Sequence, residues 1–78
     1  MIRIRLMRLG AKKKPFYRVV VADAKARRNG PYIEIIGTYN PKNDPPEINL
    51  NIERVNYWIG KGAQPSDTVK NLIKSVTA

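Results

Sequence analysis

The chain has 78 residues and a formal net charge of +9, and it contains neither cysteine nor histidine. A chain this short builds one hydrophobic core, so we expect a single domain over residues 1–78. Without cysteine and histidine it lacks disulfides, the usual zinc ligands, thiol nucleophiles and the commonest general base, so we expect no catalytic residue, no metal site and no cofactor.

Residues 2–9 open the chain with a stretch in which apolar residues alternate with arginines. This period of two is typical of a strand that is buried on one side. Residues 10–15 contain a glycine, three lysines and a proline, which predicts an exposed basic loop. Residues 16–22 are aromatic and β-branched on both faces, which favours a central strand covered on both sides.

A second basic loop and a third strand follow. Residues 23–31 end in Asn-Gly-Pro, a strong turn signal, so we expect a loop there. Residues 32–39 alternate again and are expected to pair with the second strand as a hairpin. The alternation predicts one face with Ile33, Ile35 and Tyr39 and an opposite face with Glu34 and Thr38.

The pattern changes from strand to helix in the last third of the chain. Residues 40–46 are rich in proline, asparagine and aspartate and predict a loop, and residues 48–52 alternate as a short edge strand. A short helix follows, with Asn51 as its cap, Gly60 and Gly62 at its end, and an apolar stripe of Ile52, Val55 and Ile59 beside Trp58.

A second helix is predicted over residues 66–76. Ser66 is a good N-cap, Asp67 suits the positive end of the helix dipole, and the apolar stripe consists of Val69, Leu72, Ile73 and Val76. Strands followed by helices predict an α+β domain. We expect a mixed, mostly antiparallel sheet of about four strands, with two helices packed on one face.

The positive charge is concentrated in one part of the chain. Residues 1–30 hold most of the lysines and arginines and one acid, Asp23, whereas the charges of residues 31–78 balance. The whole net charge of +9 therefore lies in residues 1–30. Solubility does not require positive charge to be concentrated in one half of the chain. The concentration in residues 1–30 therefore favours binding to a long polyanion.

The candidate RNA-binding residues are the cations of this basic region and two tyrosines close to them. Arginine can fix a phosphate or a guanine edge through two parallel hydrogen bonds, and bases can stack on the rings. The other aromatic residues, Phe16, Tyr39, Tyr57 and Trp58, are expected in the core. The candidates are Arg3, Arg5, Arg8, Lys12, Lys13, Lys14, Tyr17, Arg18, Lys25, Arg27, Arg28 and Tyr32.

Two other functions compete with RNA binding as explanations of the sequence. A magnesium-dependent nuclease with a basic substrate channel could use Asp23 and Glu34, but magnesium needs carboxylates that converge on one octahedral site. A membrane-surface module is disfavoured because the amphipathic helix over 66–76 carries only Lys70 and Lys74. No apolar run approaches a membrane span and the chain begins with alternating charge, so we expect a soluble, cytoplasmic protein that does not contact membranes and is monomeric when free.

Several blocks of the sequence resemble those of the bacterial-type small-subunit ribosomal protein sixteen family. The blocks occur in order over nearly the whole chain: residues 5–10 (RLMRLG), 15–23 (PFYRVVVAD), 28–30 (RNG), 33–34 (IE), Gly37, 40–41 (NP) and 58–69 (WIGKGAQPSDTV).

The resemblance implies a mixed α+β fold and a structural place in the small ribosomal subunit. It further implies contact with the 5′ region of the small-subunit RNA, contact with neighbouring small-subunit proteins, and support of subunit assembly. Similar proteins occur in bacteria, plastids and mitochondria, so an organellar ribosome remains an alternative to the cytoplasmic one.

Overall fold

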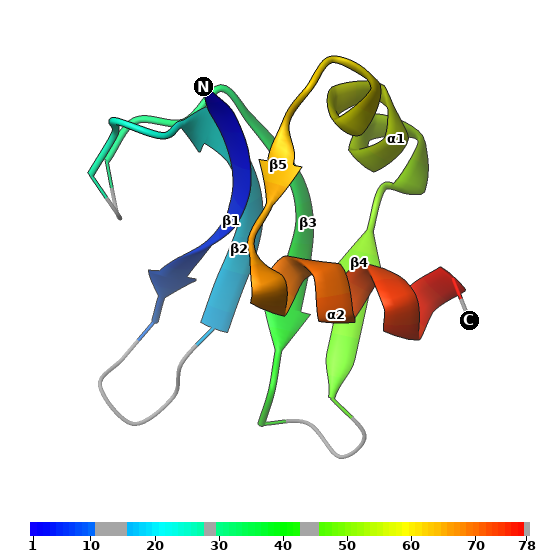
Figure 1. The fold of residues 1–78 in the computed structure, drawn as a ribbon. Helices are drawn as coiled ribbons and strands as arrows, with labels where there is room; N and C mark the ends of the chain where they lie inside the picture. The colour runs from blue at the N-terminus through cyan, green and yellow to red at the C-terminus, as the bar shows by residue number, and fades with distance from the viewer. Residues whose placement is uncertain (11–15, 28–29, 43–45, 78) are drawn as a thin grey trace.

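The computed structural model describes residues 1–10, 16–27, 30–42 and 46–77. It contains five strands and two helices within these ranges (Figure 1). The elements in chain order are β1 (Ile2–Leu9), β2 (Phe16–Asp23), β3 (Glu34–Asn40), β4 (Glu47–Leu50), α1 (Ile52–Gly60), β5 (Gln64–Pro65) and α2 (Asp67–Thr77).

The five strands form one mixed sheet with the order β4-β3-β2-β1-β5. Antiparallel pairing joins β1 to β2, β2 to β3 and β3 to β4, whereas β5 is parallel to β1. The predicted α+β class and the mostly antiparallel sheet are confirmed. The fifth strand was not predicted, and it pairs only with Arg3 and Ile4 of β1.

Both helices pack on the same face of the sheet (Figure 1). In β1 and β2 this face carries Ile4, Val19 and Val21, which are almost completely inaccessible to solvent. The core cluster joins them to Val55 of α1 and Val69 of α2. The predicted strand alternation over residues 2–9 therefore has the expected result, with apolar side chains turned toward the helices.

The predicted faces of the third strand are wrong. Val19 pairs with Gly37 and Val20 pairs with Ile35, so β3 carries one extra residue, Ile36, at this point. Such a bulge reverses the alternation of side chains on either side of it. Ile36 is 2% exposed and lies in the core, whereas Ile35 is 40% exposed and Ile33 is 53% exposed. The strand also begins at Glu34, two residues later than predicted.

The predicted helix caps are confirmed. The side chain of Asn51 accepts a hydrogen bond from the Arg54 N–H, and the Ser66 hydroxyl accepts one from the Val69 N–H, each at 3.3 Å. Gly62 follows α1 with a φ of 94°, a conformation that suits glycine. In the described part of the chain, neither helix is long and apolar enough to cross a membrane.

The apolar stripes of the helices are narrower than predicted. Val55, Val69 and Leu72 are buried, but Ile59 is 41% exposed and Val76 is 40% exposed. Tyr57, which was expected in the core, is 46% exposed because it lies two residues from the buried Val55 and so on the outer side of α1.

Candidate nucleic-acid interface

A groove follows the edge of β1 next to the start of α2. Strand β5 covers this edge only at Arg3 and Ile4, and Ser66 continues the contact by donating its N–H to the Ile4 carbonyl at 3.0 Å. Among the described residues no strand pairs with β1 beyond Ile4 on this side. The space left open, which we call the β1 groove, has a volume of about 560 Å³ and is lined by Arg3, Arg5, Leu6, Arg8, Tyr17, Ser66 and Thr68, among others.

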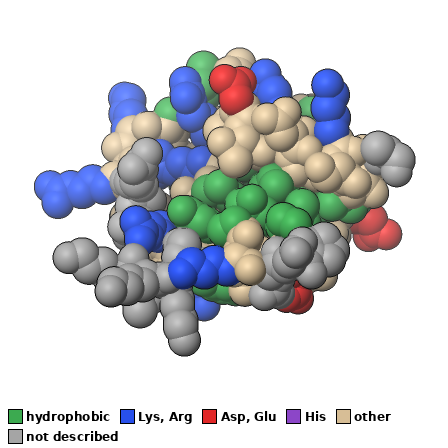
Figure 2. Space-filling model, turned by 90° about the horizontal axis from the view of Figure 1, so that it is seen from below, with side chains coloured by type: hydrophobic (Ala, Val, Ile, Leu, Met, Phe, Trp, Pro, Cys, Tyr) green, Lys and Arg blue, Asp and Glu red, His purple; other side chains and the backbone are tan. Residues whose placement is uncertain are grey.

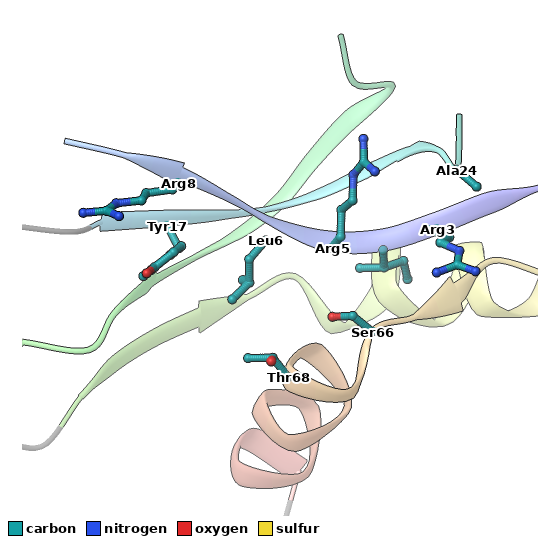
Figure 3. A pocket seen from close by; sticks show the side chains of 9 residues that line it. Arg3, Arg5, Leu6, Arg8, Tyr17, Ala24, Ser66 and Thr68 are labelled. Carbon is teal, nitrogen blue, oxygen red and sulfur yellow. The ribbon is translucent and has the colours of Figure 1, made fainter. Parts of the chain in front are cut away.

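The close-up shows how these side chains are distributed (Figure 3). Arg3 and Arg8 lie toward opposite ends of the groove, and Leu6 and Tyr17 lie between them on the side that faces α2. Ser66 and Thr68 form the opposite wall at the first turn of α2. The groove therefore combines positive ends, an aromatic and apolar middle, and a wall with two hydroxyl groups.

Tyr17 is held in place by its neighbours across the sheet. It pairs with Arg8 of β1 on one side and with Tyr39 of β3 on the other. The rings of Tyr17 and Tyr39 are stacked, with centroids 5.9 Å apart and an interplanar angle of 28°. Tyr17 also lines the groove, and its side chain is half-buried.

Arg5 has a structural contact that the sequence did not predict. Its Nη2 donates hydrogen bonds to the carbonyl oxygens of Ala26 at 2.9 Å and Arg27 at 3.0 Å. These carbonyls belong to the segment that follows β2, so Arg5 holds this segment against β1. The side chains of Lys25 and Arg27 in the same segment are exposed.

The remaining candidates are dispersed. Arg18 is half-buried, and strand alternation places it on the sheet face opposite to Tyr17. Tyr32 is 41% exposed in the segment before β3. Lys12, Lys13, Lys14 and Arg28 lie outside the described residues. Most lysine and arginine side chains visible in Figure 2 lie on the side of β1 and β2, at the left of the view.

The two acids considered for a magnesium site have other roles. Asp23 accepts a hydrogen bond from the Lys25 N–H at 2.9 Å, and this bond lowers the pKa of Asp23, with nearby positive charges acting in the same direction. Glu34 is paired with Arg54, whose hydrogen bonds lower the pKa of Glu34. The described ranges contain no group of three acidic residues that could hold a metal ion. The nuclease alternative therefore has no support.

Sequence reasoning found the cations and Tyr17 of the groove but missed Ser66 and Thr68 as part of it. Ser66 was recognised only as a helix cap. Strand β5 was not predicted, and it is this strand that places Ser66 and Thr68 at the groove. Its short parallel pairing with β1 brings the start of α2 beside residues more than fifty positions earlier in the chain.

Comparison with known proteins agrees with the resemblance seen in the sequence. The sequence model of the family described as Ribosomal protein S16 matches residues 8–66. The small ribosomal subunit protein bS16 of Thermodesulfovibrio yellowstonii is 87% identical over 78 residues, which are 100% of both chains. The bS16 protein of Alkaliphilus oremlandii is 58% identical over 94% of this chain and 90% of its own length. That of Roseiflexus castenholzii is 57% identical over 97% of this chain and 82% of its own length. A family match over most of the chain and identities of this size show that the chain belongs to the ribosomal protein S16 family.

Proposed function

We propose that this protein is a structural, non-catalytic component of the small ribosomal subunit that binds ribosomal RNA through its basic surface. The surface consists of the β1 groove and the segment after β2 that Arg5 holds against β1. Its exposed cations are Arg3, Arg8, Lys25 and Arg27. The single observation that carries the proposal is this gathering of positive charge around one edge of the sheet.

The surface suits folded RNA better than a short acidic ligand. Double-stranded RNA presents its phosphates and its shallow minor groove, whereas its bases are difficult for side chains to reach. Cations on β1 and on the segment after β2 can contact phosphates on separate turns or strands of RNA. Because the contacts are mainly with the backbone, the protein recognises the shape of the RNA rather than a base sequence.

The family resemblance supports the more specific parts of the proposal. We infer that the RNA contacted is the 5′ region of the small-subunit RNA, that other small-subunit proteins lie next to the chain, and that binding supports assembly of the subunit. We place the protein in the cytoplasmic ribosome, in line with the bacterial sources of its relatives. In the free state we expect a monomer.

Chemical footprinting of small-subunit RNA with and without the protein tests the proposal directly. We expect protected backbone positions in the 5′ region, and RNA without protected positions would contradict RNA binding. A salt titration adds an independent measurement. If about six cations contact phosphates, the logarithm of the affinity should fall against the logarithm of salt with a slope of roughly −4 to −5.

The charge-removing variant Arg27→Ala should flatten this slope by about one unit. Lys74→Ala is the matched control, because Lys74 is exposed in the last turn of α2 and its loss should leave the slope almost unchanged. A slope close to zero for the unmodified protein would rule out binding by phosphate contacts.

A further inference from the structure

We propose that the β1 groove receives one unpaired nucleotide of the RNA, with the base on the ring of Tyr17 and the flanking phosphates near Arg3 and Arg8. This proposal rests on the RNA binding proposed above and specifies its ligand. It assigns to the groove a looped or bulged nucleotide, whereas the cations on the segment after β2 contact the backbone of paired RNA.

The size and lining of the groove fit a nucleotide. Its volume of about 560 Å³ falls in the range of sites for small ligands, roughly 300–1,000 Å³. Leu6 and Tyr17 form an apolar middle on which a base can lie, and the ends are positive. A base within a duplex is stacked on its neighbours and cannot reach the Tyr17 ring, so the occupant must be unpaired.

Tyr17 offers a ring that is already oriented. Tyr39 occupies one side of it at a centroid distance of 5.9 Å, and both residues are fixed on adjacent strands. A base that enters the groove extends this aromatic stack without requiring the ring to be ordered first. Stacking on a fixed ring loses less conformational freedom than stacking on a mobile one.

The polar groups of the groove suit the other parts of a nucleotide. Arg3 and Arg8 are five positions apart on β1, which corresponds to about 16 Å along the strand. Strand alternation turns these two side chains to opposite faces of the sheet, and both line the groove because it follows the open edge of β1. Each guanidinium can therefore approach a phosphate on one side of an extruded base. The exposed Asp67 adjoins Ser66 and Thr68 at the start of α2, and its charge disfavours a phosphate on that wall. The hydroxyl groups there can instead bind the sugar or the edge of the base.

The main chain of β1 provides further groups for recognition. The Ile4 carbonyl points toward β5, since it accepts the hydrogen bond from Ser66. Residues at alternate positions of a strand present their main-chain groups to the same side, so the N–H and C=O of Leu6 also point into the groove. In the described structure no strand takes up these groups at Leu6, and the edge of a base can bind them.

A tyrosine outside the groove provides a stringent comparison. Tyr57 is 46% exposed on α1, but the cationic groups of Arg54 and Lys61 already lie 4.4 Å and 5.6 Å from its ring centroid. It also lacks the apolar floor and the pairing with Tyr39 that hold Tyr17. An assay that responds to Tyr17 and not to Tyr57 therefore distinguishes the groove from general stacking on exposed rings.

The test uses two RNA hairpins of equal length. In one hairpin a single 2-aminopurine is bulged, and in the other the same base is paired within the stem. We expect the full-length protein to bind the bulged hairpin more tightly, on the order of tenfold, and to quench its 2-aminopurine fluorescence. Equal affinity for the two hairpins would overturn the proposal while leaving phosphate binding intact. If neither hairpin bound, both this proposal and the proposed function would be wrong.

Variants then locate the stacking residue. Tyr17→Leu should remove the preference for the bulge and the quenching, and Tyr17→Phe, which restores a ring, should restore both. Tyr57→Leu is the control and should keep them. Circular dichroism checks that each variant is folded. If Tyr17→Leu does not fold, the affinities of the unmodified protein for the two hairpins still test whether it binds an unpaired nucleotide. Loss of the preference in Tyr57→Leu would move the stacking site to α1 and refute the assignment to the β1 groove.

Discussion

The guanidinium of Arg54 in α1 donates two parallel hydrogen bonds to the carboxylate of Glu34 at the start of β3. Nε donates to Oε2 at 2.7 Å and Nη2 donates to Oε1 at 2.5 Å. The same guanidinium lies 4.4 Å from the ring centroid of Tyr57. Planar two-point pairing of this kind fixes geometry as well as charge. The helix is thus attached to the sheet by a polar contact as well as by Val55.

This ion pair predicts a dependence of stability on acid. The hydrogen bonds from Arg54 lower the pKa of Glu34 in the folded protein. A lowered pKa adds stability above the unfolded pKa, and this stability is lost as the pH falls through the folded pKa. We expect Glu34→Gln to melt at a lower temperature than the unmodified protein at neutral pH, with the two melting temperatures converging below about pH 4. The double variant with Arg54→Gln should melt little lower than Arg54→Gln alone. A difference that persisted unchanged at about pH 3 would show that the charge of Glu34 is not responsible.

Local features of the sequence predicted local structure well, because their physics involves near neighbours. The caps Asn51 and Ser66 act on N–H groups three residues away, and the alternation of β1 depends only on strand geometry. The bulge at Ile36 arises from register between two strands, so the alternation within β3 alone gave the wrong faces. The two-residue strand β5 is too short to have a recognisable period.

In the candidate site too, features that depend on near neighbours were predicted from the sequence, and contacts between distant segments were not. The basic character of residues 1–30 and the ring of Tyr17 were evident from composition and order. The hydrogen bonds from Arg5 to carbonyls 21 and 22 positions away depend on the folded hairpin. Thr68 joins the groove only because β5 turns the chain beside β1. A contact between distant segments leaves no periodic trace in either segment, and its residues could not be found from sequence.

Arg5 should affect RNA binding through its hold on the segment after β2. Arg5→Lys keeps the charge, but the ammonium group cannot reproduce the planar donors that bind the carbonyls of Ala26 and Arg27. We expect the affinity for small-subunit RNA at fixed salt to fall roughly threefold to tenfold, the range for one net hydrogen bond. Hydrogen exchange of the amides near Arg27 should become faster. Lys74→Arg provides the control, since Lys74 is exposed in the last turn of α2, outside the proposed surface, and the charge is likewise retained. Equal affinities for the two variants would mean that Arg5 contributes charge alone.

Gly37 should tolerate no side chain. A Cβ added there would lie 2.4 Å from the Asn49 carbonyl oxygen and 2.6 Å from Leu50 Cδ2, so β3 and β4 would have to separate. We expect Gly37→Ala to lower the free energy of unfolding by about 1–3 kcal/mol or more, measured by urea denaturation. Gly60→Ala is the matched control, because a Cβ at the end of α1 meets nothing within 4 Å. A loss of stability at Gly60 as large as that at Gly37 would show that the close approach of β4 does not decide the result.

Leu72 should be the main anchor of α2. It is 6% exposed in the core cluster, so truncation to alanine removes buried contacts and leaves a cavity. We expect Leu72→Ala to lower the free energy of unfolding by about 2–5 kcal/mol. That is a large part of the roughly 5 kcal/mol expected for a small domain, so much of the free variant should be unfolded. Val76→Ala on the same helix is 40% exposed and should stay within about 0.5 kcal/mol of the unmodified protein. A melting curve unchanged by Leu72→Ala would show that α2 is not docked in solution.

RNA affinity at fixed salt and magnesium should be almost constant between pH 6 and 8. The chain has no histidine, the side chain that ordinarily changes charge in this range. The pKa values of Asp23 and Glu34 are both lowered, so these carboxylates stay ionised throughout and their neighbours Lys25 and Arg54 keep the same electrostatic environment.

A single substitution can introduce a side chain that changes charge between pH 6 and 8, and this variant serves as a control. Arg27 is exposed on the segment after β2, and Arg27→His places a group of ordinary pKa near 6.5 at a proposed phosphate contact. We expect this variant to bind RNA more tightly at pH 6 than at pH 8, where it should approach the affinity of Arg27→Ala. The unmodified protein should show no such trend in the same titration. If its affinity changed with pH as strongly as that of the histidine variant, a titrating group other than the side chains named here would control binding, and the fixed positive charge of β1 and the segment after β2 would not explain the affinity.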